Sequence, residues 1–268
     1  MSSSPSPGSA CATLKVMALN SSKDSRFHEL KLKSPGWEWT PGQFVMVRPV
    51  NWEHDPLGGR PLSIGDLDDE VLHLYFQVVG KGTAHLARLK PGDDVLVWGP
   101  LGKGFEVNPN VPTMLLAGGM GIVPFVGLAR HHPRPENIEI LFGHQYELHN
   151  YPFQNIENRI LAWNIQDRSV KDLEKMKRAL EIKIKGYSPD GAILACGPRP
   201  FLQKIQAESA LHGARTQISL ETTMACGIGA CLGCTILSTS GQYLQACQDG
   251  PVFWSKDIVL ADDREDKA

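Results

Sequence analysis

The chain of 268 residues lacks the features that mark several large classes of protein. It has no apolar run of 18 residues, so a membrane-spanning helix is not expected. Its formal net charge is only −2, and it has neither a basic block, which would suggest nucleic acid, nor an acidic tract. No carboxylate pair or activated nucleophile stands out. We therefore do not expect bond-breaking chemistry on an organic substrate from this chain.

A secretory signal is also missing, because the N-terminus has no charged segment followed by an apolar one. We expect residues 1–12 to form a disordered leader, residues 262–268 to be frayed, and the protein to be cytoplasmic. Cys11 has no spacing partner and is expected to be a free thiol. Without export, disulfides are a less favourable use of cysteine than metal ligation.

Cysteine is concentrated near the end of the chain. The pattern is C-x4-C-x2-C-x12-C, with glycines between the first three cysteines, and its members are Cys226, Cys231, Cys234 and Cys247. The first three spacings are typical of plant-type [2Fe–2S] ligands. A glycine-rich loop can curl tightly and point backbone N–H groups at the thiolates. A structural zinc site or a pair of disulfides remains an alternative.

The first third of the chain has the pattern of an antiparallel β-barrel, in which short apolar runs alternate with Pro-Gly and Gly-Gly turns. The runs are 14–19, 27–32, 44–47, 71–79 and 95–98. Between them, Arg60 and Ser63 offer a guanidinium and a hydroxyl at the spacing of a flavin motif. Gly80-Lys-Gly-Thr83 follows about 20 residues later. An ordinary strand in a flavin-free barrel is the alternative.

The middle of the chain predicts a parallel α/β domain, because apolar strands alternate with helices. A strand at 113–117 runs into a glycine turn at 118–124 and a helix at 125–131. Such a turn can bind a pyrophosphate, although its glycines do not have the G-x-G-x-x-G spacing. A tight joint that binds nothing is the alternative. Further strands are expected at 138–142 and 191–196, with a helix at 201–212 and a short run at 216–220.

The runs Met224–Cys234 and Cys247–Phe253 resemble the electron-transfer subunits of type B dihydroorotate dehydrogenases, in the ferredoxin–NADP reductase superfamily. The resemblance implies an FAD-binding β-barrel at 13–108, a nicotinamide-nucleotide-binding α/β domain at 109–219 and a [2Fe–2S] module at 220–268. It implies FAD contacts from Arg60, Pro61, Leu62, Ser63, Tyr75, Phe76, Gln77, Gly82 and Thr83. It implies NAD(H) or NADP(H) contacts from Gly118, Gly119, Gly121, Cys196, Gly197 and Pro198. It makes the four clustered cysteines the [2Fe–2S] ligands, whereas Cys196 has the alternative of a small buried hydrophobe.

The segment 164–178 departs from the family pattern, because it is a charged stretch that lacks the usual glycines. We expect an exposed helix there, with Asp172/Lys175 and Glu174/Arg178 as ion pairs. The choice between NADH and NADPH therefore stays open. The arginines 130, 134 and 159 could bind a 2′-phosphate, but solvated surface charge is the simpler interpretation.

The resemblance also implies a partner, an FMN-containing dihydroorotate-oxidising subunit in a heterotetramer, from which electrons pass through this chain to NAD⁺. Two alternatives remain. One is the equivalent reductase subunit of another redox complex, of the NADH-dependent ferredoxin:NADP oxidoreductase or sulfhydrogenase type. The other is a non-catalytic sensor that uses the cluster as a signal.

Overall fold

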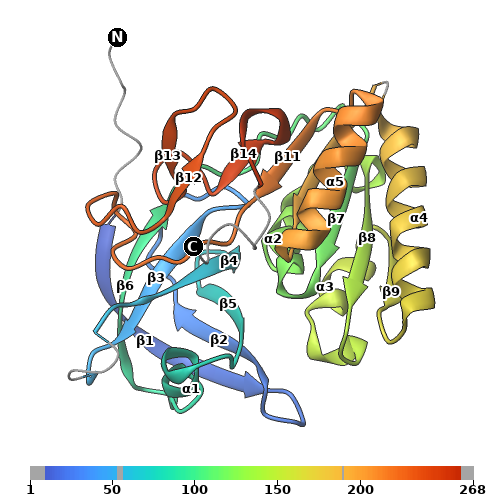
Figure 1. Ribbon diagram of the computed structural model, residues 1–268. Coiled ribbons are helices and arrows are strands. Elements are labelled where there is room, and N and C mark those ends of the chain that lie inside the picture. The colour runs from blue at the N-terminus through green and yellow to red at the C-terminus, as the bar shows by residue number, and fades with distance from the viewer. Residues whose placement is uncertain (1–9, 53–56, 189, 261–268) are drawn as a thin grey trace.

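The computed structural model describes residues 10–52, 57–188 and 190–260 (Figure 1). Most of the expected leader and the expected frayed end lie outside these residues. The expected leader is too long, however, because Ala10 to Ala12 already belong to the first strand. Ala10 pairs with Gly99 and Ala12 with Val97, so the barrel begins at Ala10 and not at 13.

The first half of the chain forms a closed six-stranded barrel in the order β1-β2-β5-β4-β3-β6. Its inward side chains alternate with outward ones, as in β6, and the inward ones form an apolar core that includes Leu30, Leu74 and Val97. One short helix, α1 (Lys81–Leu86), lies between β5 and β6. The strands are β1 (Ala10–Ser21), β2 (Phe27–Lys33), β3 (Phe44–Pro49), β4 (Arg60–Leu67), β5 (Val71–Gln77) and β6 (Asp94–Leu101).

The second half is built on a sheet in the order β14-β11-β10-β7-β8-β9, in which the neighbours from β11 to β9 run parallel. Helices α2 and α3 pack with one apolar cluster, and α4 and α5 with another. The strands are β7 (Thr113–Gly118), β8 (Ile138–His144), β9 (Leu161–Gln166), β10 (Ala192–Cys196), β11 (Thr216–Ser219) and β14 (Val252–Trp254). The helices are α2 (Pro124–His131), α3 (Phe153–Glu157), α4 (Val170–Tyr187) and α5 (Arg199–His212).

The last segment, which contains the four clustered cysteines, is joined to the parallel sheet. It contains a two-stranded hairpin of β12 (Thr235–Leu237) and β13 (Tyr243–Gln245), but β14 then returns to pair antiparallel with β11. The parallel sheet therefore includes residues from beyond 219. Since β11 ends at Ser219 and β14 begins at Val252, this pairing brings together both ends of the segment that contains the four cysteines.

The structure divides the atypical segment differently from the expectation. Residues 164–166 end strand β9, and the helix α4 runs from Val170 to Tyr187, well past 178. Ser169 caps the helix by accepting a hydrogen bond from the Asp172 N–H. The expected ion pair of Asp172 with Lys175 forms, whereas Glu174 pairs with Lys177 and not with Arg178.

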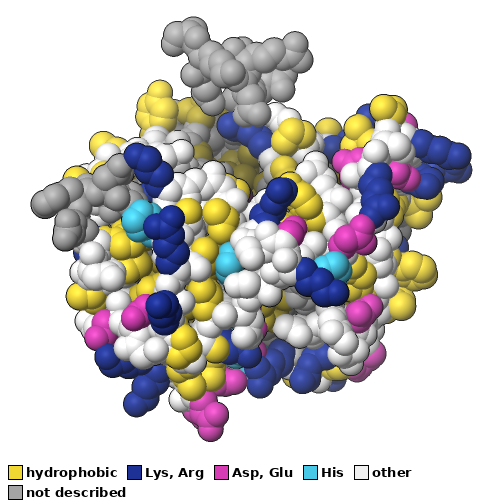
Figure 2. Space-filling view, turned by 90° about the horizontal axis from the view of Figure 1, so that it is seen from below, with side chains coloured by type: hydrophobic (Ala, Val, Ile, Leu, Met, Phe, Trp, Pro, Cys, Tyr) yellow, Lys and Arg dark blue, Asp and Glu magenta, His cyan; other side chains and the backbone are white. Residues whose placement is uncertain are grey.

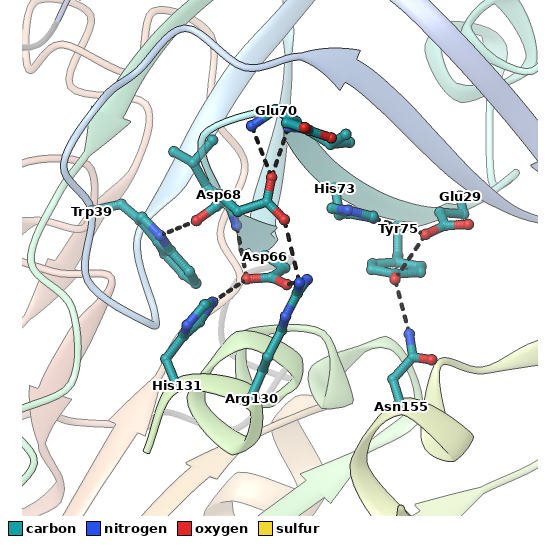
Figure 3. Close-up of polar contacts among 12 residues, drawn as sticks. Glu29, Trp39, Asp66, Asp68, Glu70, His73, Tyr75, Arg130, His131 and Asn155 are labelled. Atoms are coloured by element: carbon teal, nitrogen blue, oxygen red, sulfur yellow. Dashed lines mark hydrogen bonds and ion pairs between the residues drawn. The ribbon is translucent and has the colours of Figure 1, made fainter. Parts of the chain in front are cut away.

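A polar contact joins the barrel to the α/β domain. The Asp66 side chain, which is 3 % exposed, accepts hydrogen bonds from Arg130 and from His131 at the end of α2 (Figure 3). Beside it, a Cβ at Gly127 would lie 2.4 Å from the Trp39 ring. The same Cβ would lie 2.9 Å from the Gly65 carbonyl oxygen of β4, so glycine at 127 allows α2 to pack closely on that strand. No helix among the described residues is long and apolar enough to cross a membrane.

Candidate functional site

The loop from Cys226 to Cys234, called the cysteine loop below, has the backbone conformation that its glycines predict. Gly227 and Gly229 have φ values of 72° and 80°, in the left-handed region that favours glycine. This shape directs N–H groups at sulfur: Ile228 donates to Cys226 Sγ at 3.4 Å and Gly229 to Cys247 Sγ at 3.2 Å. Such bonds stabilise thiolates, which are the metal-binding form of cysteine.

Cys226, Cys231 and Cys234 lie along the loop before β12, and Cys247 follows β13. Cys234 and Cys247 are buried against Met46, whereas Cys231 is exposed. Burial and the neighbouring Cys234 thiol raise the pKa of Cys247. Burial also acts to raise the pKa of Cys226, but hydrogen bonds from surrounding N–H groups lower it overall. In the described parts of the chain, no group of three or more His, Cys, Asp or Glu side chains is arranged to hold a metal ion. In kind and number, however, four thiols with backbone N–H donors match the ligands of a two-iron cluster.

The cysteine loop rests on the barrel. The Trp98 indole nitrogen, in β6, donates a hydrogen bond to the Cys226 carbonyl at 3.0 Å. A Cβ at Gly59 would lie 2.5 Å from the same indole, and a Cβ at Gly227 would lie 2.7 Å from Met46. The Trp98 ring therefore contacts both the loop and Gly59, the residue that precedes Arg60. No sequence motif predicted this role for Trp98.

The expected flavin residues on β4 and β5 divide between two faces. Ile64 of β4 pairs with Leu74 of β5 in an antiparallel register, so Ser63 lies opposite Tyr75. Both of these residues face the outside of the barrel. Phe76 and Leu62 point inward instead, where they are 3 % and 7 % exposed in the barrel core. Successive side chains of a strand point to opposite faces, so the cofactor contacts predicted for Leu62 and Phe76 would come from their backbone groups. Pro61 and Gln77 are partly exposed, as Ser63 is.

Arg60 lies over the start of α1. A Cβ at Gly82 would lie 1.9 Å from Arg60 Nε, so only glycine permits this position of the guanidinium. The Thr83 hydroxyl accepts hydrogen bonds from the N–H groups of Val79 and Gly80 and orders the turn. Arg60 of the first expected flavin motif therefore lies next to Gly82 of the second.

The glycine turn and the Cys-Gly-Pro element also meet, because β7 and β10 are adjacent parallel strands. A Cβ at Gly121 would lie 2.3 Å from the Cys196 carbonyl oxygen, and one at Gly118 would lie 2.9 Å from Pro198. Gly119 has a φ of 54°. A Cβ at Gly197 would likewise lie 3.0 Å from the Gly118 backbone. This is the carboxyl-end crevice of an open α/β sheet, where such folds bind ligands.

Cys196 lies in this crevice as a neutral side chain. Burial raises the pKa of its thiol to about 12, with a further contribution from the Glu221 carboxylate. The thiol is therefore protonated at neutral pH. A protonated thiol acts as a small apolar surface and not as a nucleophile.

A cleft of about 620 Å³ opens between the barrel and α2 and α3, and it shares only Tyr75 with the expected site residues. In it the Tyr75 hydroxyl donates to Glu29 at 3.0 Å and accepts from Asn155 at 3.2 Å (Figure 3). His73 also bonds Glu29, at 2.9 Å. Burial and the Glu29 charge raise the pKa of Tyr75. The sequence did not predict this group, because its members are far apart in the chain and match no motif.

Two of the three arginines considered for a 2′-phosphate line this cleft, which also reaches Met120 of the glycine turn. Arg130 is paired with Asp66 and Asp68, and Arg159 is exposed at the end of α3. Figure 2 shows Lys and Arg side chains interspersed with Asp and Glu on the face that it presents, not gathered into a patch of one sign. The geometry gives no support to a 2′-phosphate site at Arg130.

Residues 221–259 match a family model described as the iron-sulfur cluster binding domain of dihydroorotate dehydrogenase B. The chain is 33 % identical over 258 residues to the dihydroorotate dehydrogenase B (NAD(+)) electron transfer subunit of Clostridium acetobutylicum, covering 93 % of this chain and 98 % of that one. It is 35 % identical over 232 residues to the subunit of the same name in Desulforamulus reducens, covering 82 % and 86 %.

Solved structures show the same fold. A structure of an NADH-dependent reduced ferredoxin-NADP oxidoreductase matches with a TM-score of 0.77 at 24 % identity, over 93 % of this chain and 90 % of that one. A ferredoxin NADP⁺ reductase from Neisseria gonorrhoeae, with bound FAD and NADP, matches with a TM-score of 0.61 at 15 % identity, over 76 % and 92 %. With its cysteine loop and near end-to-end sequence match, the chain belongs to the family of dihydroorotate dehydrogenase B electron transfer subunits.

Proposed function

We propose that this chain carries electrons from a dihydroorotate-oxidising partner subunit to NAD⁺, through a [2Fe–2S] cluster and an FAD. The observation that carries the proposal is the contact between the two cofactor regions. The cysteine loop bonds Trp98, and a Cβ at Gly58 would lie 3.5 Å from the Ala225 carbonyl, just before Arg60. An electron-transfer subunit needs the regions that hold its two redox centres to be in contact.

The cluster would be held by Cys226, Cys231, Cys234 and Cys247. A [2Fe–2S] cluster, when bound, carries one electron at a time. The loop N–H groups would stabilise the ligating sulfurs, and the apolar residues beneath Cys234 and Cys247 would exclude water from the barrel side. Cys231 would lie on the exposed side, toward a partner.

The FAD would lie along the outer face of β4 and β5. Arg60 would bind its pyrophosphate, and Ser63 would hydrogen-bond the ring system. We assign the remaining contacts to residues on this face and at the start of α1, which are Pro61, Tyr75, Gln77, Gly82 and Thr83. FAD, when bound, links two-electron hydride exchange to single-electron transfer.

The nicotinamide nucleotide would bind at the carboxyl ends of β7 and β10. Backbone N–H groups of the turn at Gly118, Gly119 and Gly121 would bind the pyrophosphate, close to the start of α2. Gly197 and Pro198 would hold the opposite wall, and the neutral Cys196 thiol would exclude water beside the nicotinamide.

The partner that fits is the FMN-containing catalytic subunit, and we propose a heterotetramer with two copies of each chain. We also propose that the complex is cytoplasmic, since none of the six cysteines forms a disulfide. Family membership favours this function over the equivalent subunit of another redox complex and over a cluster sensor.

The test is dihydroorotate-dependent reduction of NAD⁺ by this chain combined with a dihydroorotate-oxidising partner. We expect NADH to form only with both chains present. The Cys231→Ser variant should stop NADH formation, while the partner still reduces an artificial acceptor. A loaded chain that contains flavin and cluster but supports no dihydroorotate-dependent NADH formation would overturn the proposal.

A further inference from the structure

A tight turn at the end of β13 contains Cys247, the last of the four clustered cysteines. Residues 245–249 form this turn, which is called the Cys247 turn below. The Asp249 N–H donates to the Gln245 carbonyl at 2.7 Å, and the Gln245 N–H donates to a carboxylate oxygen of Asp249 at 2.8 Å. Side chains of this kind order a turn by bonding nearby backbone groups. The Asp249 carboxylate therefore closes the segment that presents the Cys247 sulfur.

The Cys247 turn contacts the cysteine loop at two places. The Ala246 N–H donates to the Cys234 carbonyl at 3.0 Å. A Cβ at Gly229 would lie 2.7 Å from the Gln245 side-chain oxygen, and the Gly229 N–H donates to Cys247 Sγ at 3.2 Å. The position of the turn therefore sets where Cys247 lies relative to Cys234 and relative to its own N–H donor.

The other side of the turn is fixed to the barrel and the sheet. The Gly250 carbonyl accepts a hydrogen bond from the Lys103 N–H at 2.5 Å, and a Cβ at Gly102 would lie 2.2 Å from the same oxygen. Two residues later, β14 begins and pairs with β11 (Figure 1). Asp249 lies directly before this supported part of the chain. Its bonds to Gln245 therefore connect the Cys247 turn to a rigid neighbour.

The Asp249 carboxylate also brings a negative charge to the cluster region. It is two residues from Cys247 and partly buried, and no Lys, Arg or His in the part of the chain that the structure describes forms an ion pair with it. The potential of an iron–sulfur cluster depends on the net charge around it and on hydrogen bonds to its sulfurs. A nearby carboxylate disfavours the reduced cluster, because reduction adds a negative charge that the carboxylate repels.

We propose that Asp249 is a positioning residue for the [2Fe–2S] cluster, which orients Cys247 through the Gln245 backbone and lowers the reduction potential of the cluster through its charge. The inference rests on the proposed function, since it requires a cluster on the four cysteines. A lower potential makes the reduced cluster a stronger electron donor to the flavin. This gives a role to the aspartate of the run Cys247-Gln-Asp-Gly-Pro251, in which the sequence pattern assigned only the cysteine.

The first test separates the charge of Asp249 from its hydrogen bond. Asp249→Asn keeps an oxygen that can accept from the Gln245 N–H, and the intact mass of the variant confirms that the new amide has not hydrolysed. We expect parental iron content and parental EPR g values for the reduced cluster, but a more positive midpoint potential in a dye-mediated titration. Asp69→Asn, exposed beyond the far end of β4, is the control and should keep the parental potential. An unchanged potential in Asp249→Asn would overturn the proposed effect of the charge.

The second test removes the acceptor as well. We expect a chelator to remove iron from Asp249→Ala roughly tenfold faster than from Asp249→Asn, because loss of a group that orients a metal ligand weakens metal binding. The EPR g values of the remaining reduced cluster should shift, since Cys247 is less firmly held. Flavin content, measured on the same samples, should stay parental and report that the barrel is folded. Equal iron release from the alanine variant, the asparagine variant and the parent would contradict the positioning role.

The parent protein distinguishes this inference from the proposed function. A parent that binds no iron would contradict the four-cysteine site, and with it both proposals. A parent that contains the cluster and supports dihydroorotate-dependent NADH formation, while Asp249→Ala leaves both iron release and potential unchanged, would overturn only the role of Asp249.

Discussion

The Trp98 indole nitrogen donates a hydrogen bond at 3.0 Å to the backbone carbonyl of Cys226, which ties the first cysteine of the loop to strand β6 of the barrel. The same indole covers Gly59, next to the proposed flavin arginine. One side chain therefore contacts both regions that the electron path needs. It also fixes the position of a loop that has little other regular structure.

Replacing Trp98 should loosen that loop. Trp98→Phe keeps an aromatic ring but removes the donor, and a net loss of about 1 kcal/mol in stability is expected. We expect faster loss of iron on exposure to a chelator, measured as the decay of cluster absorption. Trp37→Phe is the control, because no hydrogen bond joins the Trp37 side chain to another residue that the structure describes. Equal iron loss from both variants would show that the Trp98 bond does not hold the loop.

The Asp66 contact should stabilise the seating of α2 on the barrel. Asp66→Asn removes a buried charge that bonds Arg130 and His131. Since Arg130 is partly exposed, we expect a loss of about 1–3 kcal/mol in unfolding free energy and not the full cost of a buried pair. Urea unfolding measures this, with the exposed Asp69→Asn as the control. An Asp66 variant as stable as its control would contradict this role.

Glu29 should make stability depend on pH in the acid range. Burial acts to raise the pKa of Glu29, but hydrogen bonds from His73 and Asn20 outweigh it and lower the pKa from 4.5 to about 2. Because the folded-state value is depressed, the stabilisation is present above pH 4.5 and is lost as the pH falls toward 2. The shift corresponds to something on the order of 3 kcal/mol.

Glu29→Gln should therefore remove part of the acid sensitivity. Urea unfolding at pH 6 and pH 3 should give a smaller difference between the two pH values in the variant than in the parent. The exposed Glu70→Gln should keep the parental difference. If Glu29→Gln and the parent lose equal stability between these pH values, the assigned pKa is wrong.

The close approach at Gly121 should be intolerant of a side chain. Gly121→Ala would place a Cβ 2.3 Å from the Cys196 carbonyl, a backbone group that can move only by displacing β10. We expect a loss of about 1–3 kcal/mol in stability and weaker NADH binding by calorimetry. Gly186→Ala, in α4 with open space around it, should be neutral or stabilising. Unchanged NADH affinity in Gly121→Ala would remove this turn from the nucleotide site.

Local patterns predicted much of this molecule. The glycine turn, its flanking strand and helix, and the cysteine loop are set by residues within a few positions of one another, so their spacing carries the information. Tyr75, Phe76 and Gln77 were expected to line the cofactor together, whereas strand alternation directs the middle side chain into the barrel core.

Other features depend on contacts between distant parts of the chain. Trp98 meets Cys226 across 128 residues, and Glu29 meets Tyr75 across 46. The pairing of β14 with β11, which merges the last segment with the parallel sheet, is equally non-local. The segment 164–166 reads as part of a charged stretch, but pairing with β8 makes it a strand. Tertiary context decides such cases.

The most direct test of the proposed electron path is the visible spectrum of the anaerobically purified protein, with iron and flavin quantified, before and after addition of NADH. We expect flavin bands, a cluster shoulder, about two irons and one FAD per chain, and bleaching of both chromophores by NADH. Protein that contains zinc and no chromophore, or flavin and cluster that NADH leaves oxidised, would contradict the account.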